Sequence, residues 1–492
     1  YHAYYVPGWD CHGLPIEHKV EEELKGKKKT LPAHVVRKIC REYATKWVKI
    51  QKAEFQRLGV LGDWDHPYLS MVPEFEATTS RELANFVEKG NVIRAKKPIY
   101  WCGHCHTALA EAEVEYKDID SYSIYVRFRL DDPAVTRVFP KADPSRCYVI
   151  IWTTTPWTIP DNCAVCLNPK FSYALVEAGG EQFLLARDLL EPCAKIFGWE
   201  KYEILGEAAG EALEGIKARH PLAPLDPYYD RPSPIVLGGH VTLDSGTGCV
   251  HTAPGFGADD YQTCKRYGMD MVVPVDDQGR HTDYAGKYAG MVVEESNPVI
   301  LKDMKESGAL LASEEIVHSY PHCWRCKHPI IFRATPQWFC SVDAFKDEAC
   351  AACDEVRWVP GWGIDRMKSM IRERADWCIS RQRRWGLPIP VVYCKDCGKP
   401  VVTDETIAAV SDLFGKEGSN AWFDKDPADF LPAGLTCPHC GGKSGFEKET
   451  DTLDGWFDSG STHFASMKRD QGFWPADMYL EGLDQYRGWF QS

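Results

Sequence analysis

The side chains with the clearest chemical spacing are cysteines, which number 20 among 492 residues. Six pairs have the spacing C-x-x-C, and these are Cys102/Cys105, Cys163/Cys166, Cys323/Cys326, Cys350/Cys353, Cys394/Cys397 and Cys437/Cys440. This cysteine content is well below the roughly 8–10% of a disulfide scaffold, and a chain of this length does not need disulfides for stability. Thiolate pairs at this spacing are typical zinc ligands. Metal binding is therefore the first chemistry to consider.

A zinc knuckle needs a tight polar turn whose free backbone amides point at the thiolates. Four pairs have such surroundings, namely Cys102/Cys105, Cys323/Cys326, Cys394/Cys397 and Cys437/Cys440. Cys163-Ala-Val-Cys166 instead lies in an apolar, strand-like run, where residues three apart point to opposite faces. Cys350-Ala-Ala-Cys353 lies in a helical pattern, where Cys and Ala are small core residues. We predict that these last two pairs are structural.

The four knuckles supply thiolates for two tetrahedral zinc sites, and a site with four thiolates has no position left for water. The pairs that begin at Cys394 and Cys437 are about 40 residues apart and predict a zinc ribbon. The pairs that begin at Cys102 and Cys323 are left to form the other site, which predicts a whole domain inserted between them. Reduced free thiols or redox pairs are the alternatives, but a redox pair normally opens a helix, whereas these pairs are followed by Gly, Thr or Pro. We expect two structural Zn²⁺ ions per chain.

The elements that must position these knuckles differ along the chain. Apolar residues at helical spacing predict a helix within Leu31–Leu58, ended by Gly59, and a second over Pro73–Glu88. Between the first two knuckles, Tyr122–Leu130 alternates as a half-buried strand. Further strand-like runs are Cys147–Trp152, Tyr173–Glu177, Gln182–Ala186, Ile235–Leu237 and Gly248–Thr252. The inserted segment is thus predicted to be a β-rich, barrel-like domain, and from about residue 319 the pattern returns to mixed α/β.

Composition sets the broad class. The length suggests about three domains, and the 44% apolar and 26% charged residues are typical of a soluble globular protein. No apolar run approaches the roughly 18 residues of a membrane span, and there is no signal-peptide pattern. We therefore expect no membrane partner and a cytoplasmic protein. The chain begins at Tyr1 and not at Met, from which we expect a fragment.

The net charge of −14 excludes a basic surface over the whole chain, although not a local one. One local cluster comprises Arg366, Lys368, Arg372, Arg374, Arg381, Arg383 and Arg384. Such a cluster is either a solvated helix face or a surface that binds phosphates. The sequence leaves both interpretations open.

Several longer motifs carry a family resemblance. They are Tyr5-Val-Pro-Gly-Trp-Asp-Cys-His-Gly-Leu-Pro-Ile-Glu17, Trp152-Thr-Thr-Thr-Pro-Trp-Thr158, Gly246-Thr-Gly-Cys-Val-His-Thr-Ala-Pro-Gly255, Ile379-Ser-Arg-Gln-Arg-Arg-Trp-Gly386, Trp456-Phe-Asp-Ser-Gly-Ser461 and Glu481-Gly-Leu-Asp-Gln-Tyr-Arg-Gly-Trp-Phe490. With these motifs in this order, the chain resembles the class I aminoacyl-tRNA synthetases from end to end. Among them it is most similar in its motifs to the isoleucyl-tRNA synthetases.

The resemblance implies an α/β fold, in which a Rossmann-type catalytic domain is interrupted by a β-rich editing domain and zinc-bearing connective segments. We expect the catalytic domain in two parts, 1–100 and 346–492, with the zinc ribbon at 390–445. The connective stems are expected at 101–120 and 319–345, and the editing domain at 121–318.

The implied activity is the ATP-dependent formation of isoleucyl-adenylate, followed by transfer to tRNA(Ile). ATP with Mg²⁺, isoleucine and tRNA(Ile) are thus the expected substrates and partners, and a monomer is expected. The family's His-x-Gly-His and Lys-Met-Ser-Lys-Ser motifs, which bind ATP, are absent from this sequence. We therefore expect that these 492 residues alone lack synthetic activity.

In the synthetic site, the α-ammonium of the amino acid needs a carboxylate partner, because an unpaired buried charge is costly. The resemblance assigns this role to Asp10, with Glu481 and Gln485 opposite. Gly482 and Asp484 are expected at the ribose and adenosine side. Trp385 and Trp489 are expected to form apolar walls for the branched side chain, although core packing is the ordinary role of tryptophan.

Such a pocket cannot reject valine well. One missing methylene is worth only about 1–3 kcal/mol, a limit for which isoleucyl-tRNA synthetase is itself the standard example. The resemblance implies a second, hydrolytic site, where Thr153, Thr154 and Thr155 position a water and exclude isoleucine. Asp260 would pair with the ammonium of mischarged valine, and His251 would orient the ester. A threonine run is otherwise an ordinary strand sequence.

Two rival functions remain at this point. The first is a free-standing aminoacyl-tRNA deacylase that only edits. The second is a non-enzymatic zinc-ribbon protein that binds RNA tightly, in a salt-dependent manner, and without turnover.

Overall fold

The computed structural model describes residues 4–25, 31–467 and 474–492. The chain forms two compact units. The first unit contains residues 1–95, 110–112 and 336–492, and the second unit contains residues 96–109 and 113–335. The chain passes from the first unit to the second within β3 (Val92–Cys102) and returns within β15 (Ile331–Cys340).

The second unit is built on a mixed sheet, which has ten strands within the described ranges. They are β5 (Val114–Arg129), β6 (Cys147–Thr153), β7 (Ala164–Leu167), β8 (Ser172–Ala178), β9 (Glu181–Ala186), β10 (Glu203–Ala209), β11 (Lys217–Arg219), β12 (Pro232–Leu237), β13 (Cys249–Thr252) and β14 (Leu310–Cys323). Their order is β10-β8-β9-β6-β13-β7-β12-β11-β5-β14. An additional pairing of β5 with β6 closes the middle of this sheet into a barrel.

Local sequence explains several of these strands. The strand predicted over Tyr122–Leu130 is confirmed as the second half of β5, but the predicted half-buried alternation is wrong, because residues 123–126 are all buried between the neighbouring strands β14 and β6. The other predicted runs correspond to β6, β8, β9, β12 and β13. A two-residue turn at Gly179-Gly180 joins β8 to β9, with φ values of 58° and 84° that match the twist of a hairpin. Central barrel residues such as Val149, Ile151 and Val165 have no exposed surface. The core therefore lies inside the closed strands.

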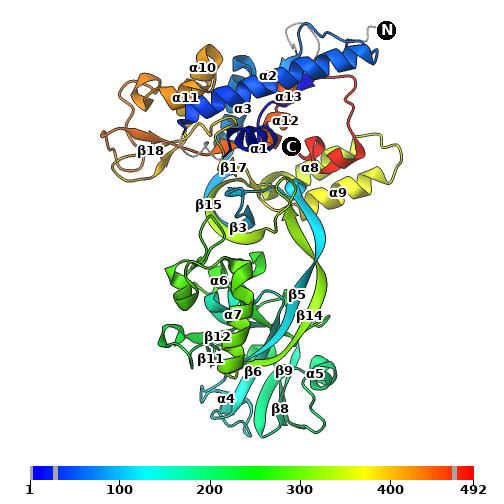
Figure 1. Cartoon of the computed structure of the whole chain (residues 1–492), viewed down its shortest axis with the longest axis vertical. Helices are drawn as coiled ribbons and strands as arrows, with labels where there is room; N and C mark the ends of the chain where they lie inside the picture. The colour runs from blue at the N-terminus through cyan, green and yellow to red at the C-terminus, as the bar shows by residue number, and fades with distance from the viewer. Residues whose placement is uncertain (1–3, 26–30, 468–473) are drawn as a thin grey trace. The chain divides into compact units, whose positions relative to one another are not determined.

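Short helices and one long ribbon complete the second unit. The helices are α4 (Val135–Val138), α5 (Leu190–Ile196), α6 (Ala258–Arg266) and α7 (Val293–Glu306), and a 3₁₀ segment, η3, covers Pro156–Asp161. Figure 1 shows β5 and β14 side by side as a long two-stranded ribbon, paired from Leu310 opposite Val126 to Cys323 opposite Val114. The ribbon therefore carries the end of β14 away from the barrel.

The first unit is mainly helical, with short strands. Its larger helices are α1 (Leu14–Leu24), α2 (Ala33–Arg57), α3 (Pro73–Glu88), α8 (Lys346–Asp354), α9 (Gly363–Glu373) and α10 (Asp404–Glu417). β1 (Gly8–Trp9) and β2 (Tyr68–Leu69) form a parallel pair. The two predicted helices are confirmed as α2 and α3. Val36, Cys40 and Ala44 recur at helical spacing and are buried, which explains why α2 packs along one face.

The rest of the first unit surrounds these helices with small elements. They are β16 (Trp377–Cys378), β17 (Ser380–Arg381), β18 (Val392–Cys394), β19 (Pro400–Val401), α11 (Ala421–Asp424), β20 (Phe446–Lys448), β21 (Thr452–Leu453), α12 (Gly455–Gly460), α13 (Thr462–Ala465), η11 (Leu483–Arg487) and η12 (Trp489–Gln491). β18 pairs with both β19 and β20. Among the described helices, none combines the length and the apolar character needed to cross a membrane.

Candidate functional site

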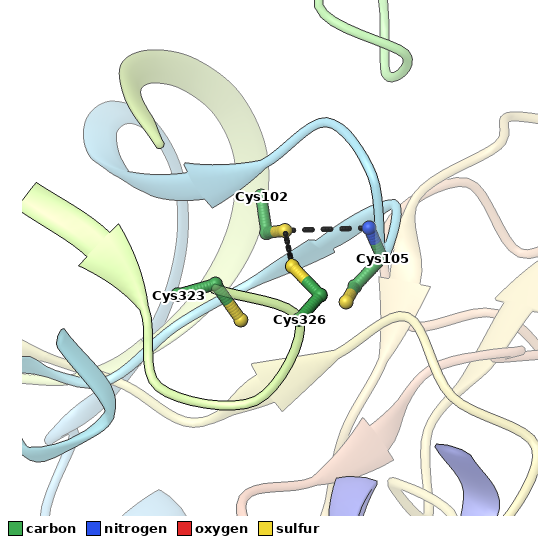
Figure 2. Close-up of side chains that lie close together, drawn as sticks. All are labelled: Cys102, Cys105, Cys323 and Cys326. Atoms are coloured by element: carbon green, nitrogen blue, oxygen red, sulfur yellow. Dashed lines mark hydrogen bonds between the residues drawn. The ribbon is translucent and has the colours of Figure 1, made fainter. Parts of the chain in front are cut away.

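The second unit brings Cys102, Cys105, Cys323 and Cys326 into one cluster of thiols, as Figure 2 shows. Cys102 ends β3 and Cys323 ends β14, so two strands distant in sequence supply one knuckle each. The Cys102 and Cys326 sulfurs are 3.5 Å apart, and the backbone amide of Cys105 donates to the Cys102 sulfur at 3.3 Å. At a Zn–S distance of about 2.3 Å, tetrahedral thiolates lie about 3.8 Å apart. The donor set and its spacing thus fit a structural zinc ion.

A second cluster in the first unit contains Cys394, Cys397, Cys437 and Cys440. The sulfurs of Cys394 and Cys440 are 3.8 Å apart, and those of Cys397 and Cys437 are 3.7 Å apart. Cys394 ends β18, the central strand of the three-stranded ribbon sheet. This donor set fits zinc for the same reason as the first cluster. The zinc itself stays a prediction for both clusters.

All four knuckles share one backbone feature beyond their spacing. The residue directly after the second cysteine has a positive φ, and these residues are His106 (52°), Lys327 (62°), Gly398 (68°) and Gly441 (70°). In three of them the amide of this residue donates to the carbonyl of the first cysteine at 2.8–2.9 Å, which closes the turn. The two excluded pairs have no such turn, because Cys166 lies in β7 and both Cys350 and Cys353 lie in α8. Glycine after the pair is therefore the sequence signal for two knuckles, whereas His106 and Lys327 give none.

Asp10 directly follows β1 in the first unit, and its Oδ2 accepts a hydrogen bond from the Ser459 hydroxyl at 2.5 Å. Desolvation of the carboxylate by the surrounding protein raises the pKa of Asp10 to about 6, although the hydrogen bond from Ser459 lowers it. The carboxylates of Asp458 and Glu481 raise this pKa further. A carboxylate held in this acidic surrounding gains most from a cationic partner. An ammonium group is such a partner.

Beside Asp10, His12 lies between two buried carboxylates. Its Nδ1 is 2.8 Å from Asp458 Oδ2, and its Nε2 is 3.6 Å from Glu76 Oε1. Burial alone lowers the pKa of His12, but the two acids outweigh burial and raise it overall. Glu76 also accepts from the Ser419 amide at 2.6 Å and the Ser419 hydroxyl at 2.7 Å. The two carboxylates therefore favour the imidazolium form of His12, which joins the residues after β1 to helices α3 and α12.

Trp385 is fully buried, with no exposed surface, and its indole donates to the Cys11 carbonyl at 2.7 Å. The rings of His12 and Trp385 form a T-shaped pair, with their centroids 5.0 Å apart. The Arg37 guanidinium carbon lies 5.3 Å from the centroid of the Trp385 ring. Arg37 is itself buried and donates to Asn420, Ser419, and the carbonyls of Arg384 and Gly386. The structure thus places Trp385 in the core, with no open face toward a ligand.

The other predicted pocket residues lie near the C-terminal end of the chain. Glu481 accepts from the Tyr479 hydroxyl at 2.5 Å, and Gln485 accepts from the Trp489 amide at 3.1 Å. Trp489 is half-buried and stacks on Tyr479, with ring centroids 3.7 Å apart. The Asp484 carboxylate folds back over Gly482, where a Cβ atom would lie 2.4 Å from it. A Cβ atom at position 482 would therefore require the flexible Asp484 side chain to move.

The buried charges around His12 predict a clear stability effect. Replacing Glu76 with glutamine removes one of the two carboxylates that compensate the imidazolium, and we expect a loss of about 3 kcal/mol in the free energy of unfolding. Urea unfolding followed by tryptophan fluorescence measures this loss. Glu74→Gln is the matched control, because Glu74 is an exposed acid on the same helix. Superimposable curves for Glu76→Gln and the parent would contradict the role of the ion network.

In the second unit, the predicted threonine run lies where β6 ends. Thr153 is the last residue of β6, and Thr154 and Thr155 lead into η3, with all three side chains half-buried. β6 is parallel to β13, with Trp152 opposite Val250. Thr153 and His251 therefore follow this pair at the same edge of the barrel. The Thr155 amide donates to the Thr153 hydroxyl at 3.0 Å, which fixes the turn.

Both ring nitrogens of His251 have hydrogen-bond partners that no sequence pattern indicates. Thr158 Oγ1 is 3.0 Å from its Nε2, and Asn162 Nδ2 is 2.8 Å from its Nδ1. Because Asn162 Nδ2 also donates to the Ala164 carbonyl, it is the amide nitrogen that faces the ring. Nδ1 of His251 thus accepts and Nε2 carries the proton. Burial lowers the pKa of His251 to about 4, so the ring is neutral at physiological pH.

Asp260 lies in the first turn of α6, and its Oδ2 accepts from the Ala253 amide at 2.9 Å, two residues after His251. Burial raises the pKa of Asp260 to about 6, although the bond from Ala253 opposes this shift. β13 and the start of α6 therefore hold one carboxylate and one neutral imidazole close together in sequence and in space. The Asp260 carboxylate suits an ammonium group, and the neutral His251 imidazole suits a neighbouring group held by hydrogen bonds.

The basic cluster divides into two parts. Arg381 and Arg383 are buried, and the Arg381 guanidinium pairs with Asp454 at 2.8 Å. Arg384 Nη1 donates to the Leu31 carbonyl at 2.7 Å. These arginines support the fold from within. The α9 members Arg366 and Arg372 are the part that fits a solvated helix face.

Comparison with known proteins gives one consistent group. A family model described as tRNA synthetases class I (I, L, M and V) matches residues 1–492. The chain is 57% identical to an isoleucine--tRNA ligase of Desulfovibrio desulfuricans, 54% to one of Nitratidesulfovibrio vulgaris and 50% to one of Caldicellulosiruptor bescii. In each case all of this chain and 52–53% of the relative are covered, so the chain spans about half the length of the curated relatives it matches.

A structural match is also found. The LeuRS chain of the Agrobacterium radiobacter K84 LeuRS-tRNA-LeuAMS complex aligns over 94% of this chain and 51% of its own, at a TM-score of 0.32 and 15% identity.

Proposed function

The chain belongs to the class I tRNA synthetases, and from this premise we propose that it is part of an isoleucine--tRNA ligase. The protein that contains it activates isoleucine with ATP and transfers it to tRNA(Ile). The observation that carries this proposal is the 57% identity to an isoleucine--tRNA ligase over all of this chain. We further propose that the protein is cytoplasmic and monomeric.

We propose that the first unit contributes the amino-acid side of the synthetic site. Asp10 holds the ammonium of isoleucine, with Glu481 and Gln485 opposite. Gly482 and Asp484 serve the adenosine side, and Trp489 covers the branched side chain. Trp385 lies behind the apolar wall of this pocket and supports it by packing against the residues after β1. Because the sequence has neither of the family's ATP-binding motifs, we propose that the 492 residues alone form no adenylate.

The test is ATP–pyrophosphate exchange by the full-length protein that contains this chain, with isoleucine, leucine and valine as substrates. We expect exchange with isoleucine, weaker exchange with valine and none with leucine. Asp10→Asn should lower the exchange with isoleucine, while Asp65→Asn, a change of an exposed aspartate, should not. Exchange that prefers another amino acid would overturn the proposed substrate.

The pH dependence of amino-acid binding tests the role of Asp10 separately. Only the ionised carboxylate pairs with an ammonium, and the pKa of Asp10 is raised to about 6. We therefore expect isoleucine affinity to be constant above pH 7 and to fall up to tenfold per pH unit below pH 6. Isothermal titration of the full-length protein between pH 5 and 8 measures it. Asp10→Asn should bind weakly without this pH dependence.

We propose that the second unit hydrolyses mischarged valyl-tRNA(Ile), and that the division of the chain follows the expected domains. The threonine run excludes the larger isoleucine side chain and positions a water. Asp260 pairs with the ammonium of the aminoacyl group, and His251 acts as a neutral hydrogen-bonding residue, with no role as a base. The support is the joint position of Thr153, His251 and Asp260 at one edge of the barrel. Equal deacylation of valyl-tRNA and isoleucyl-tRNA would overturn the proposed selectivity.

The two thiol clusters would hold one structural zinc ion each. Four thiolates leave no open coordination position, so such an ion holds two chain segments together and activates no water. In the second unit it would fix the end of the β5–β14 ribbon to the turn after β3. In the first unit it would fix the turn after β18 to the turn before β20.

A further inference from the structure

One pair of thiols lies outside both zinc clusters. The sulfur atoms of Cys163 and Cys264 are 3.6 Å apart, although the residues are 101 positions apart in sequence. Cys163 is half-buried directly before β7, and Cys264 is buried within α6. Both are free thiols. The C-x-x-C spacing of Cys163 with Cys166 is thus misleading, because the neighbour of Cys163 in space is Cys264.

This pair joins the two sides of the proposed hydrolytic site. Cys163 follows Asn162, the partner of His251 Nδ1, and its own amide donates to the Thr252 carbonyl at 3.0 Å. Cys264 lies four residues after Asp260 on α6, which is one helical turn. A covalent bond between the two sulfurs would therefore tie α6 to the segment directly before β7.

The reduced pair is the resting state. The hydrogen bond with Cys264 raises the pKa of Cys163 well above its ordinary value, and burial and the charges of Asp161 and Asp260 act in the same direction. The protonated form of the Cys163 thiol is therefore favoured, and because the thiolate is the reactive form, Cys163 reacts slowly with an oxidant. A disulfide needs a sulfur–sulfur distance of about 2.05 Å, so the two sulfurs must approach by about 1.5 Å.

We propose that Cys163 and Cys264 form a reversible oxidation site that stops hydrolytic editing when their disulfide forms. The effect on editing rests on the proposed function, whereas the disulfide does not. With a peroxide as oxidant, the Cys163 sulfur attacks one peroxide oxygen, the O–O bond breaks, and a sulfenic acid and one water form. The Cys264 sulfur then attacks the Cys163 sulfur, the S–O bond breaks, and hydroxide leaves with the Cys264 proton as the second water. Two thiols lose two electrons in total, and the peroxide gains them.

Peptide mapping tests the disulfide itself. The chain is treated with hydrogen peroxide, free thiols are blocked with N-ethylmaleimide, and the digest is analysed by mass spectrometry without reduction. We expect one linked peptide pair that contains Cys163 and Cys264 and that a phosphine reductant separates. Cys163→Ser and Cys264→Ala should each abolish this pair, whereas Cys350→Ser, a change in the other excluded C-x-x-C pair, should leave it. Absence of the pair while other cysteines are oxidised would overturn the proposal.

Deacylation of valyl-tRNA(Ile) tests the consequence. Oxidation should lower the rate of the parent at least tenfold, and the reductant should restore it. Cys264→Ala should keep its rate under the same treatment, and since it retains both zinc clusters, it controls for zinc loss through oxidation. A disulfide that forms without any change in the rate would overturn the effect on editing. If the reduced parent shows no deacylation, the proposed function fails, and the peptide map still decides whether the site exists.

Discussion

Replacing Asp260 with alanine is expected to slow the deacylation of valyl-tRNA(Ile) by about 100-fold or more. The Asp260 side chain is half-buried beside β13, where it accepts from the Ala253 amide. Once a substrate covers it, removing one partner of the ion pair costs about 3–5 kcal/mol. If that pair forms in the transition state as well as in the bound substrate, the loss appears in kcat/KM. The measurement is single-turnover hydrolysis of radiolabelled valyl-tRNA(Ile) by this chain.

Asp259 offers a control for the same helix. It is the neighbour of Asp260 in the first turn of α6, and its side chain is exposed. Asp259→Ala should therefore change the helix charge equally but leave the rate within about twofold. A normal rate for Asp260→Ala would exclude Asp260 from ammonium binding. An equal loss for both variants would indicate an effect on α6 as a whole.

The fold of the second unit was predictable because its strands carry strong local signals. The apolar runs that became β6, β8, β9, β12 and β13 were each bounded by Gly, Pro or Asp. The barrel-like class was predicted, but the strand pairing that closes the barrel was not, because the pairing of Ile124 with Thr153 is set by the whole sheet and not by either strand. The family model confirms the predicted fold class of a class I synthetase domain.

The candidate hydrolytic site was predictable only in part. The resemblance assigned Thr153, His251 and Asp260, whereas the hydrogen bonds of His251 to Thr158 and Asn162 join positions 93 and 89 residues apart. No periodicity records a contact of this kind. Its consequence is chemical, since those two bonds determine which nitrogen of His251 carries the proton.

Trp385 illustrates the opposite situation. Composition alone assigns a tryptophan to the core, and the structure shows Trp385 fully buried against His12 and Arg37. The resemblance assigns the same residue to the wall of the amino-acid pocket, which stays a prediction. The two roles require different exposure of the ring. An adenylate analogue that contacts Trp385 should change the tryptophan fluorescence of the parent but not that of Trp385→Phe. A change of equal size in both proteins would indicate that Trp385 has only its role in the core.

Loss of one cysteine from the first thiol cluster is the second large effect that we expect. Cys323→Ser removes a zinc ligand at the end of β14, and structural zinc supplies apparent binding free energies of about 10–16 kcal/mol in zinc-finger peptides. The zinc content should fall from two ions per chain to one. The second unit should lose at least about 4 kcal/mol of its free energy of unfolding, the scale of a lost metal. Atomic emission and thermal unfolding measure these two changes.

Two control variants separate the metal from the thiol. Cys437→Ser should also remove one zinc, but it should destabilise the first unit and leave the second unit unchanged, because each cluster lies within one unit. Cys350→Ser changes a buried cysteine that is not in either cluster, and it should keep both zinc ions. A purified parent with fewer than one zinc per chain would contradict the pairing of the knuckles.

The size of the expected effect follows from the position of the cluster. β5 and β14 extend as a ribbon to Cys323, and a two-stranded ribbon is marginally stable by itself. The small core around Cys102, Cys323, Leu109 and Ile330 is the other contribution to this end of the ribbon. Without zinc, four thiols packed at this spacing would instead repel as they ionise. The metal would therefore decide whether the end of β14 stays folded against the turn after β3.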